Sequence, residues 1–410
     1  MNLYIDPGTG SMLFTILLGL LGTAGYLLRN VFVKLRFLFS GGAGKRGGGE
    51  RIPFAVFSDD KRYWTTFEPV CDEFEKRGRP LVYMTASPDD PALRKSYEHV
   101  SCRFIGEGNR AYAKLNRLEA DILLSTTPGL DIYQWRRSKG VKWYVHVLHM
   151  ATDPTTYRMF GLDCYDAVLL SGAYQEDQIR TLEKLRGLPA KELLITGLPY
   201  LDRLQKRYEE APPLPEHPVT LLLASSWGAS SLLNRYGEKI LKAALATGYR
   251  VIVRPHPQSF TAEKELLARL AAAFPDSGQL EWNRDADNFE ALRCSDIMIS
   301  DFSGVMLDFS LVFGKPVIYA DTSFDKSPYD AWWLEDEKWM FKALPRIGRQ
   351  LLPEHLDRLK EIVDETLKSP GMRQSLEEVR NEAWAHRGES ARLVADYLLE
   401  KEKELAGSAR

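Results

Sequence analysis

Residues 294–320 carry a pattern of strand, turn, helix and strand. The short apolar run at 296–300 predicts a buried strand of a parallel sheet. Apolar residues then recur at helical spacing from 305 to 313, and Gly314 ends that helix. The run at 315–319 predicts the next strand. A chain with this pattern folds into an α/β unit, because parallel strands need a crossover connection between them.

The turn between the first of these strands and the helix holds Asp301, Ser303 and Gly304. Here the carboxyl end of a strand meets the amino end of a helix, which offers unpaired backbone N–H groups and the positive end of the helix dipole. Such a turn suits a phosphate group. The alternative is that Asp301 and Ser303 only cap the helix, because Asp and Ser are common capping residues.

A second motif, Arg-Pro-His-Pro at residues 254–257, follows a strand predicted at 251–253. Its two prolines exclude continued strand or helix, so His256 is held at the carboxyl end of the strand. Ligands of open α/β sheets bind at that end. Arg254 and His256 can therefore give charge-assisted hydrogen bonds to phosphoryl oxygens, although Arg254 could instead form a salt bridge at the sheet edge.

A third turn, after the strand predicted at 219–224, opens with Ser225, Ser226 and Gly228. Its hydroxyls and accessible backbone N–H groups would suit a pyrophosphate. In a parallel sheet the three turns converge at one edge. They predict a cradle for a nucleotide diphosphate that uses neither a P-loop nor a Gly-x-Gly-x-x-Gly motif.

Four motifs stand in order along the chain: Thr-Gly-Leu-Pro-Tyr-Leu-Asp-Arg-Leu at 196–204, Arg-Pro-His-Pro at 254–257, Ser-Asp-Phe-Ser-Gly-Val-Met-Leu-Asp-Phe at 300–309 and Lys-Pro-Val-Ile at 315–318. Together they resemble the CDP-glycerol glycerophosphotransferase (teichoic acid polymerase-like) family. The resemblance implies that His256 and Ser303 contact the donor phosphates, with Asp301 and Asp308 as acidic positions around them. The chain departs from the family pattern at Tyr200, where the family typically has Arg.

Predicted strands and helices alternate through most of the chain, which indicates parallel sheets with both faces covered. The proline-rich stretch at 211–218 separates two such halves. The expected fold class is α/β, with two doubly wound Rossmann-like domains in a GT-B-like arrangement behind an N-terminal membrane-anchor helix, and an active site in the cleft between the halves. The expected strands are 53–57, 81–84, 103–105, 121–125, 143–148, 166–170, 193–195, 219–224, 251–253, 280–282, 296–300 and 315–319, and the expected helices are 63–76, 175–186, 232–246, 262–274, 289–293 and 305–313.

The chain of 410 residues is too long for one core and divides into five predicted segments. They are a membrane anchor at 1–40, a glycine-rich linker at 41–50, an N-terminal acceptor domain at 51–210, a C-terminal nucleotide-donor domain at 216–370, and C-terminal helices at 371–410 that pack across both halves.

Residues 12–28 are uncharged and mostly apolar, close to the shortest length that crosses a bilayer. Asp6 is the only charged residue before them, whereas Arg29, Lys34 and Arg36 follow. This asymmetry predicts an uncleaved anchor in the cell inner membrane, with the catalytic part facing the cytoplasm. An in-plane or re-entrant anchor and a buried core helix are the alternatives.

The composition excludes several classes of partner. Because 54 basic residues balance 56 acidic residues, no overall positive charge favours nucleic acid. The four cysteines are scattered, which indicates free thiols and no zinc site. We expect neither a metal nor a cofactor.

The acceptor side is expected near the end of the strand at 143–148. His149 at its tip is the candidate general base, because imidazole titrates near neutral pH. Period-two alternation places His146 on the other face of the sheet. The family resemblance expects a Trp-His-Gly-Thr base motif near here, where this chain reads Leu-His-Met-Ala, and a structural His149 is the alternative. Asp153 and Arg158 could line the acceptor side or belong to a solvated turn.

The predicted function is transfer of glycerol phosphate, or a related alditol phosphate, from a CDP-linked donor to a hydroxyl of a lipid-linked glycan or polyol-phosphate acceptor, with release of CMP. His149, His256 and Asp301 are the candidate catalytic residues. Arg254, His256, Ser225, Ser226, Ser303 and Gly304 are the candidate phosphate ligands. A nucleotide-sugar glycosyltransferase or epimerase, and a non-catalytic membrane-tethered scaffold, are the alternatives.

Overall fold

The computed structural model describes residues 51–285, 287–320, 327, 329–334 and 338–407. The predicted membrane anchor and glycine linker, residues 1–50, lie outside them. Within the described ranges, no helix combines the length and the apolar character needed to cross a membrane. The described residues from Ile52 onward form one compact unit.

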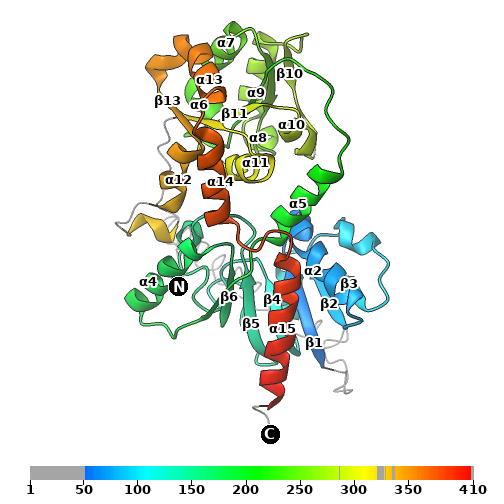
Figure 1. Cartoon of the computed structure of the whole chain (residues 1–410). Helices are drawn as coiled ribbons and strands as arrows, with labels where there is room; N and C mark the ends of the chain where they lie inside the picture. The colour runs from blue at the N-terminus through cyan, green and yellow to red at the C-terminus, as the bar shows by residue number, and fades with distance from the viewer. Residues whose placement is uncertain (1–50, 286, 321–326, 328, 335–337, 408–410) are drawn as a thin grey trace, which may run out of the picture. The chain divides into compact units, whose positions relative to one another are not determined.

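The first sheet has seven parallel strands in the order β3-β2-β1-β4-β5-β6-β7 (Figure 1). Its strands are β1 (Ile52–Ser58), β2 (Leu81–Thr85), β3 (Val100–Phe104), β4 (Ala120–Ser125), β5 (Val141–Val147), β6 (Ala167–Leu170) and β7 (Glu192–Ile195). The connecting helices include α2 (Trp64–Lys76), α3 (Asn109–Leu115) and α4 (Glu176–Arg186). We call these elements the first lobe. From β1 the chain runs outward through β2 to β3 on one side of the sheet, and from β4 it runs outward through β5 and β6 to β7 on the other side. The strand order therefore reverses between β1 and β4, which makes this pair the topological switch point.

The second sheet has six parallel strands in the order β10-β9-β8-β11-β12-β13, with its switch point between β8 and β11. Its strands are β8 (Thr220–Ala224), β9 (Arg250–Arg254), β10 (Leu280–Trp282), β11 (Ile297–Ser300), β12 (Val317–Ala320) and β13 (Gly348–Leu351). Its helices are α6 (Leu232–Tyr236), α7 (Glu238–Ala246), α8 (Ser259–Ala262), α9 (Lys264–Ala273), α10 (Phe289–Arg293), α11 (Val305–Phe313), α12 (Trp339–Ile347) and α13 (Leu359–Leu367). We call these elements the second lobe. The predicted α/β class with two parallel sheets is confirmed.

Two predicted helices differ in detail from those of the structure. The helix expected at 232–246 is split into α6 and α7, because Gly237 between them has φ +49° and ψ −126°, outside the helical region. The helix expected at 262–274 is present as α9, which starts after Glu263, a residue with φ −128°, and the short helix α8 precedes it. Neither α3 nor β13 was predicted. The strand expected at 103–105 begins earlier, at Val100 in β3, and this edge strand has only one buried residue to give it a pattern.

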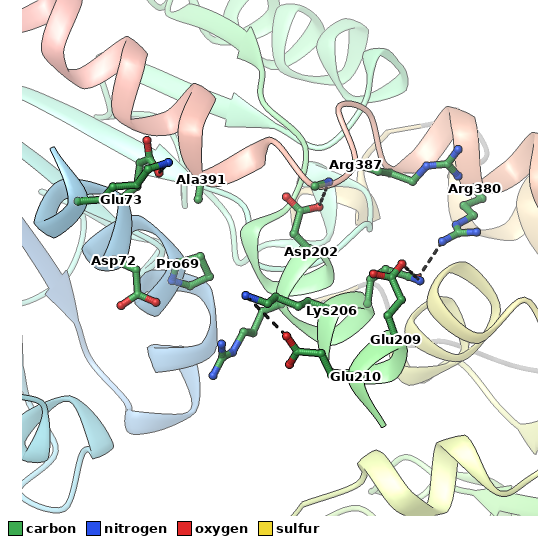
Figure 2. A pocket seen from close by; sticks show the side chains of 14 residues that line it. Pro69, Asp72, Glu73, Asp202, Lys206, Glu209, Glu210, Arg380, Arg387 and Ala391 are labelled. Carbon is green, nitrogen blue, oxygen red and sulfur yellow. Dashed lines mark hydrogen bonds and ion pairs between the residues drawn. The ribbon is translucent and has the colours of Figure 1, made fainter. Parts of the chain in front are cut away.

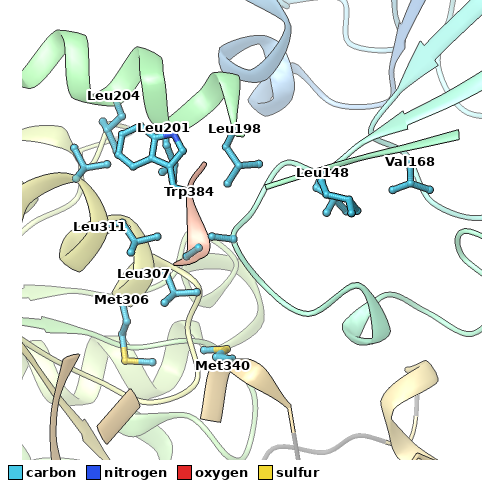
Figure 3. Close-up of a cluster of buried hydrophobic side chains, with 14 of the residues drawn as sticks. Leu148, Val168, Leu198, Leu201, Leu204, Met306, Leu307, Leu311, Met340 and Trp384 are labelled. Atoms are coloured by element: carbon cyan, nitrogen blue, oxygen red, sulfur yellow. The ribbon is translucent and has the colours of Figure 1, made fainter. Parts of the chain in front are cut away.

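A shared apolar core joins the two lobes (Figure 3). Leucines of α5 (Pro199–Glu210) and of α11 surround Trp384, which is fully buried. The C-terminal helices then cross both lobes as expected: α14 (Met372–Ala383) packs on α11 and α12, and α15 (Ser390–Gly407) packs on α2 and β4. Because the lobes share buried surface, residues from both can line one site.

Candidate functional site

A cavity of about 500 Å³ lies where the second lobe faces the first. It is at the carboxyl ends of β8, β9 and β11, which are level because Ala224 lies opposite both Arg254 and Ser300. This edge includes the switch point of the sheet, where ligands of such folds bind. From the second lobe its lining includes Ser225, Arg254, His256, Asp287, Ser303, Gly304 and Asp308, and from the first lobe Arg62, Thr65 and Met150.

The amino end of α11 forms one wall of this cavity. Ser303, Gly304 and Val305 all line it, so the positive end of a nine-residue helix dipole faces the space. Met150 of the first lobe closes the wall, because a Cβ placed on Gly304 would lie 3.5 Å from its terminal methyl carbon. This arrangement can bind an anionic group through backbone N–H donors.

His256 is arranged as a hydrogen-bond donor to the cavity. Its Nδ1 accepts a hydrogen bond of 3.1 Å from the backbone N–H of Gln258, which places the proton of the neutral ring on Nε2. Burial, and then the charge of Arg62, lower the pKa of His256, so the ring is neutral at pH 7. A neutral Nε2–H can donate to a phosphoryl oxygen without any change of protonation.

Arg254 supplies positive charge to the same wall. Its guanidinium donates to the side-chain oxygen of Asn283. Burial lowers the pKa of Arg254, although an arginine remains charged at physiological pH. Among the described residues no carboxylate lies within ion-pair distance of the Arg254 guanidinium. The alternative for Arg254, a salt bridge at the sheet edge, is therefore not found among them. Its charge can therefore act on a bound anion.

Asp301 is not part of the cavity lining. It is 1% exposed, and its carboxylate accepts hydrogen bonds from the backbone N–H of Ser226 at 3.0 Å and of Leu232 at 2.7 Å. Ser225 lines the cavity, and its Oγ donates to the carbonyl of Ser226. The Ser226 hydroxyl is buried and has no partner among the described protein atoms. Asp301 thus holds the loop between β8 and α6, and its predicted catalytic role stays a prediction.

His149 lies beside the cavity and is not part of its lining. Its Nδ1 is 2.7 Å from the Thr126 hydroxyl and 3.3 Å from the Tyr157 hydroxyl. Burial, and then the charge of Arg62, lower its pKa to about 4, so the ring is neutral at pH 7. The fully buried His146 also reaches the Tyr157 hydroxyl, through Nε2 at 3.3 Å. The prediction that the two histidines lie on opposite faces is therefore wrong, because β5 ends at Val147 and strand alternation stops there.

The two predicted acceptor-side residues are used differently. Asp153 is 1% exposed, and its carboxylate accepts from the backbone N–H groups of Trp339 at 2.8 Å and Met340 at 3.0 Å. It therefore caps the amino end of α12 and ties the first lobe to the second. Arg158 is exposed and forms a backbone bridge with Tyr329. Neither residue belongs to the cavity lining.

The sequence did not point to three residues that the structure places in the cavity lining or in contact with it. Arg62 comes from the short 3-10 helix η2 (Lys61–Tyr63) and Met150 from the loop after β5, and both line the cavity. Tyr200, at the family's arginine position, donates a hydrogen bond of 2.8 Å to Asp308 on α11. Burial raises the pKa of Asp308 to about 6, and the hydrogen bond from Tyr200 opposes that shift. For these three residues the sequence offered one signal, which was the departure of Tyr200 from the family pattern.

A larger cavity of about 900 Å³ lies among α2, α5 and the connection from α14 to α15 (Figure 2). Its lining mixes acidic and basic side chains in similar number, so it offers no concentrated charge to a phosphate. Asp202 in this lining accepts from Trp384 Nε1 at 2.9 Å and from the backbone N–H groups of Gly388 at 2.9 Å and Ser390 at 2.8 Å. Its carboxylate holds the connection between the two C-terminal helices.

Comparisons with solved structures show the fold. A UDP-GlcNAc 2-epimerase from Methanocaldococcus jannaschii is 12% identical, with a TM-score of 0.55 over 85% of this chain and 100% of the other. A UDP-GlcNAc 2-epimerase from Neisseria meningitidis, bound to UDP-GlcNAc, is 13% identical, with a TM-score of 0.54 over 85% of this chain and 99% of the other. At such low identity the likeness is one of architecture.

Comparisons of sequence are more specific. No curated protein matches the chain. The model of the CDP-glycerol:poly(glycerophosphate) glycerophosphotransferase family matches residues 158–342, which include Arg254, His256 and the turn at 301–304. This match confirms the resemblance carried by the four motifs: residues 158–342 are similar to the CDP-glycerol:poly(glycerophosphate) glycerophosphotransferase family, and the match supports a transferase of that kind.

Proposed function

We propose that the protein moves glycerol phosphate, or a related alditol phosphate, from a CDP-linked donor to a hydroxyl of a membrane-associated glycan or polyol-phosphate acceptor, and releases CMP. The observation that carries the proposal is the shared lining of one cavity by Arg254, His256 and the amino end of α11. These groups are a cation, a neutral N–H donor and a helix dipole, and together they match a diphosphate.

The reaction needs charge stabilisation on the leaving side. The acceptor oxygen forms a bond to the phosphorus of the alditol phosphate, and the bond from that phosphorus to the oxygen shared with CMP breaks. CMP leaves with the bridging oxygen and its electron pair. In the proposal Arg254 and His256 stabilise this developing charge, while Arg62 extends the positive potential from the first lobe.

The acceptor hydroxyl must also lose a proton. In the proposal His149 takes it, with Nδ1–H donating to the Thr126 hydroxyl and Nε2 left as the basic nitrogen. The pKa of about 4 keeps His149 unprotonated at neutral pH. A negatively charged donor placed nearby raises that pKa and makes the nitrogen a stronger base.

Membrane attachment through residues 1–40, with the enzyme facing the cytoplasm, belongs to the proposal as well. It rests on the apolar run at 12–28 and the basic residues that follow. An enzyme and a lipid-linked acceptor that share one membrane meet at a high effective concentration.

The test is incubation of the purified full-length protein with radiolabelled CDP-glycerol and a membrane lipid extract. We expect CMP release and label in the lipid or polymer fraction. His256→Gln should reduce the rate about 100-fold or more, as expected when a donor to a developing charge is lost. His99→Gln is the matched control and should leave the rate unchanged. His99 is exposed and directly precedes β3, the edge strand of the first lobe.

Parallel reactions with UDP- and CMP-sugars separate the alternatives. Release of UDP, or an epimerised sugar, without turnover of CDP-glycerol would replace the proposal with a nucleotide-sugar enzyme. A scaffold predicts that His149→Ala and His256→Ala leave cellular polymer production intact while the protein stays folded.

A further inference from the structure

Trp227 is an exposed aromatic residue beside the proposed donor cavity. It lies in the loop between β8 and α6, and 49% of its surface is exposed. Its ring centroid is 6.5 Å from that of His256, with 32° between the ring planes. Because His256 lines the cavity, the indole stands next to the groups proposed to bind the phosphates.

The loop holds Trp227 in place from both sides. On one side the N–H of Ser226 donates to Asp301 at 3.0 Å. On the other side the N–H of Gly228 donates to Glu263 Oε1 at 2.9 Å, and Gly228 has φ +94°, which favours glycine strongly. Two carboxylates from different elements thus fix the backbone around an indole whose ring is left open to solvent.

A pyrimidine nucleotide places its base one ribose away from its phosphates. If the phosphates bind at His256 and the amino end of α11, a base one ribose away can reach Trp227, whose ring centroid is 6.5 Å from that of His256. Stacking of a base on a fixed aromatic ring supplies affinity with little dependence on which base is bound.

We propose that Trp227 is the stacking surface for the pyrimidine base of the nucleotide donor, an inference that rests on the proposed CDP-linked donor. Trp227 then supplies affinity for the nucleotide, and the choice between cytosine and uracil is made by other contacts. The inference extends the site beyond the phosphate ligands to a residue that lies in the predicted turn at 225–228 but is not part of the cavity lining.

The experiment is isothermal titration calorimetry of the full-length protein with CDP, UDP and inorganic pyrophosphate. Trp227→Ala should weaken CDP and UDP binding equally, by about 10-fold, and leave pyrophosphate binding unchanged. Trp227→Phe should restore most of the lost affinity, because it keeps an aromatic face. Trp332→Ala is the matched control, since Trp332 is another indole with 56% of its surface exposed, and should bind all three probes like the wild type.

Three results would overturn the inference: CDP binding of Trp227→Ala equal to the wild type, an equal loss of pyrophosphate binding, or a wild-type protein that does not bind CDP. Other outcomes test the proposed function independently of the role of Trp227. CDP binding that depends on Trp227, without transfer from CDP-glycerol, supports the stacking role and refutes the transferase donor. Transfer at an unchanged KM in Trp227→Ala supports the donor and refutes the stacking role.

Discussion

A carboxylate that follows a strand can face a ligand or can accept hydrogen bonds from neighbouring loops. Asp301 and Asp153 do the second, because each has two backbone N–H groups within hydrogen-bond distance and is almost fully buried. Asp308, inside a helix, lines the cavity and accepts a hydrogen bond from the side chain of Tyr200. Residue type and spacing suggested all three, and only the directions of their side chains separate them.

Asp308 gives a prediction at the residue scale. Its folded-state pKa of about 6 lies above the ordinary value of 3.8, so the folded protein binds more protons than the unfolded chain between these pH values. Stability contributed by the protonated carboxyl is therefore present below pH 3.8 and is lost as pH rises through 6. Asp308→Asn should raise the free energy of unfolding at pH 7.5 by about 1–3 kcal/mol, because an amide does not ionise.

Urea denaturation of both proteins from pH 4 to pH 8 measures this effect. The difference between variant and wild type should grow up to about pH 6.5 and then level off, as the linkage relation requires. A difference that is constant across the range would show that Asp308 does not titrate there. Asp177→Asn, on an exposed residue of α4, controls for the loss of a surface charge.

At the scale of elements, the loop between β8 and α6 carries residues of both the proposed phosphate site and the proposed base-stacking surface. Ser225 lines the cavity from this loop, and Trp227 projects from it. Asp301, which follows β11, fixes the loop through two backbone hydrogen bonds. The sequence predicted the flanking strands from their apolar runs. It could not predict that Asp301, in the turn after β11, would accept hydrogen bonds from the loop after β8.

Asp301→Ala should therefore affect both stability and binding. Two buried N–H groups lose their acceptor, which should lower the free energy of unfolding by about 2–4 kcal/mol. CDP affinity, measured by calorimetry at a temperature where the variant is folded, should also fall because the loop is no longer fixed. Asp296→Ala is the control: Asp296 accepts from the Thr220 N–H at 2.8 Å, just before β11 at the opposite end of that strand. It should cost stability and spare CDP binding, whereas unchanged CDP affinity in Asp301→Ala would contradict the role of the loop.

At the scale of the whole molecule, the lobes are joined by a shared core and by polar contacts across it. Asp153 of the first lobe caps α12 of the second, and Trp384 is buried between α5 and α11. These contacts set the position of Arg62 and Met150 opposite the donor side. The cavity is thus a property of both lobes together.

Asp153→Ala tests this joint. Loss of the cap should lower the free energy of unfolding by about 1–3 kcal/mol, measured by urea denaturation. Asp153→Asn keeps one oxygen acceptor and should fall between the alanine variant and the wild type. Asp177→Ala on the exposed face of α4 should change stability little. Equal stability of the alanine variant and the wild type would show that the cap contributes nothing.

Periodicity and turn chemistry are local properties, and the sequence by itself determined what depends on them. It predicted the parallel α/β class, most strands, the resemblance to the family whose model matches residues 158–342, and the placement of Arg254, His256, Ser303 and Gly304 at strand ends that meet at one edge. It could not predict the break at Gly237, because a glycine inside a helical pattern does not reveal its own dihedral angles.

Tertiary structure alone decided which side chains face the cavity and what the other lobe contributes. Tyr200 and Asp308 are separated by 108 residues. Met150 approaches Gly304 from the loop after β5, a strand of the first sheet, whereas Gly304 follows a strand of the second sheet. No periodic pattern within one segment records such a pair, because its geometry follows from how two separately wound sheets pack on a common core. The strand ends could be predicted from local sequence patterns, whereas the cavity that they share forms only when the two lobes pack together.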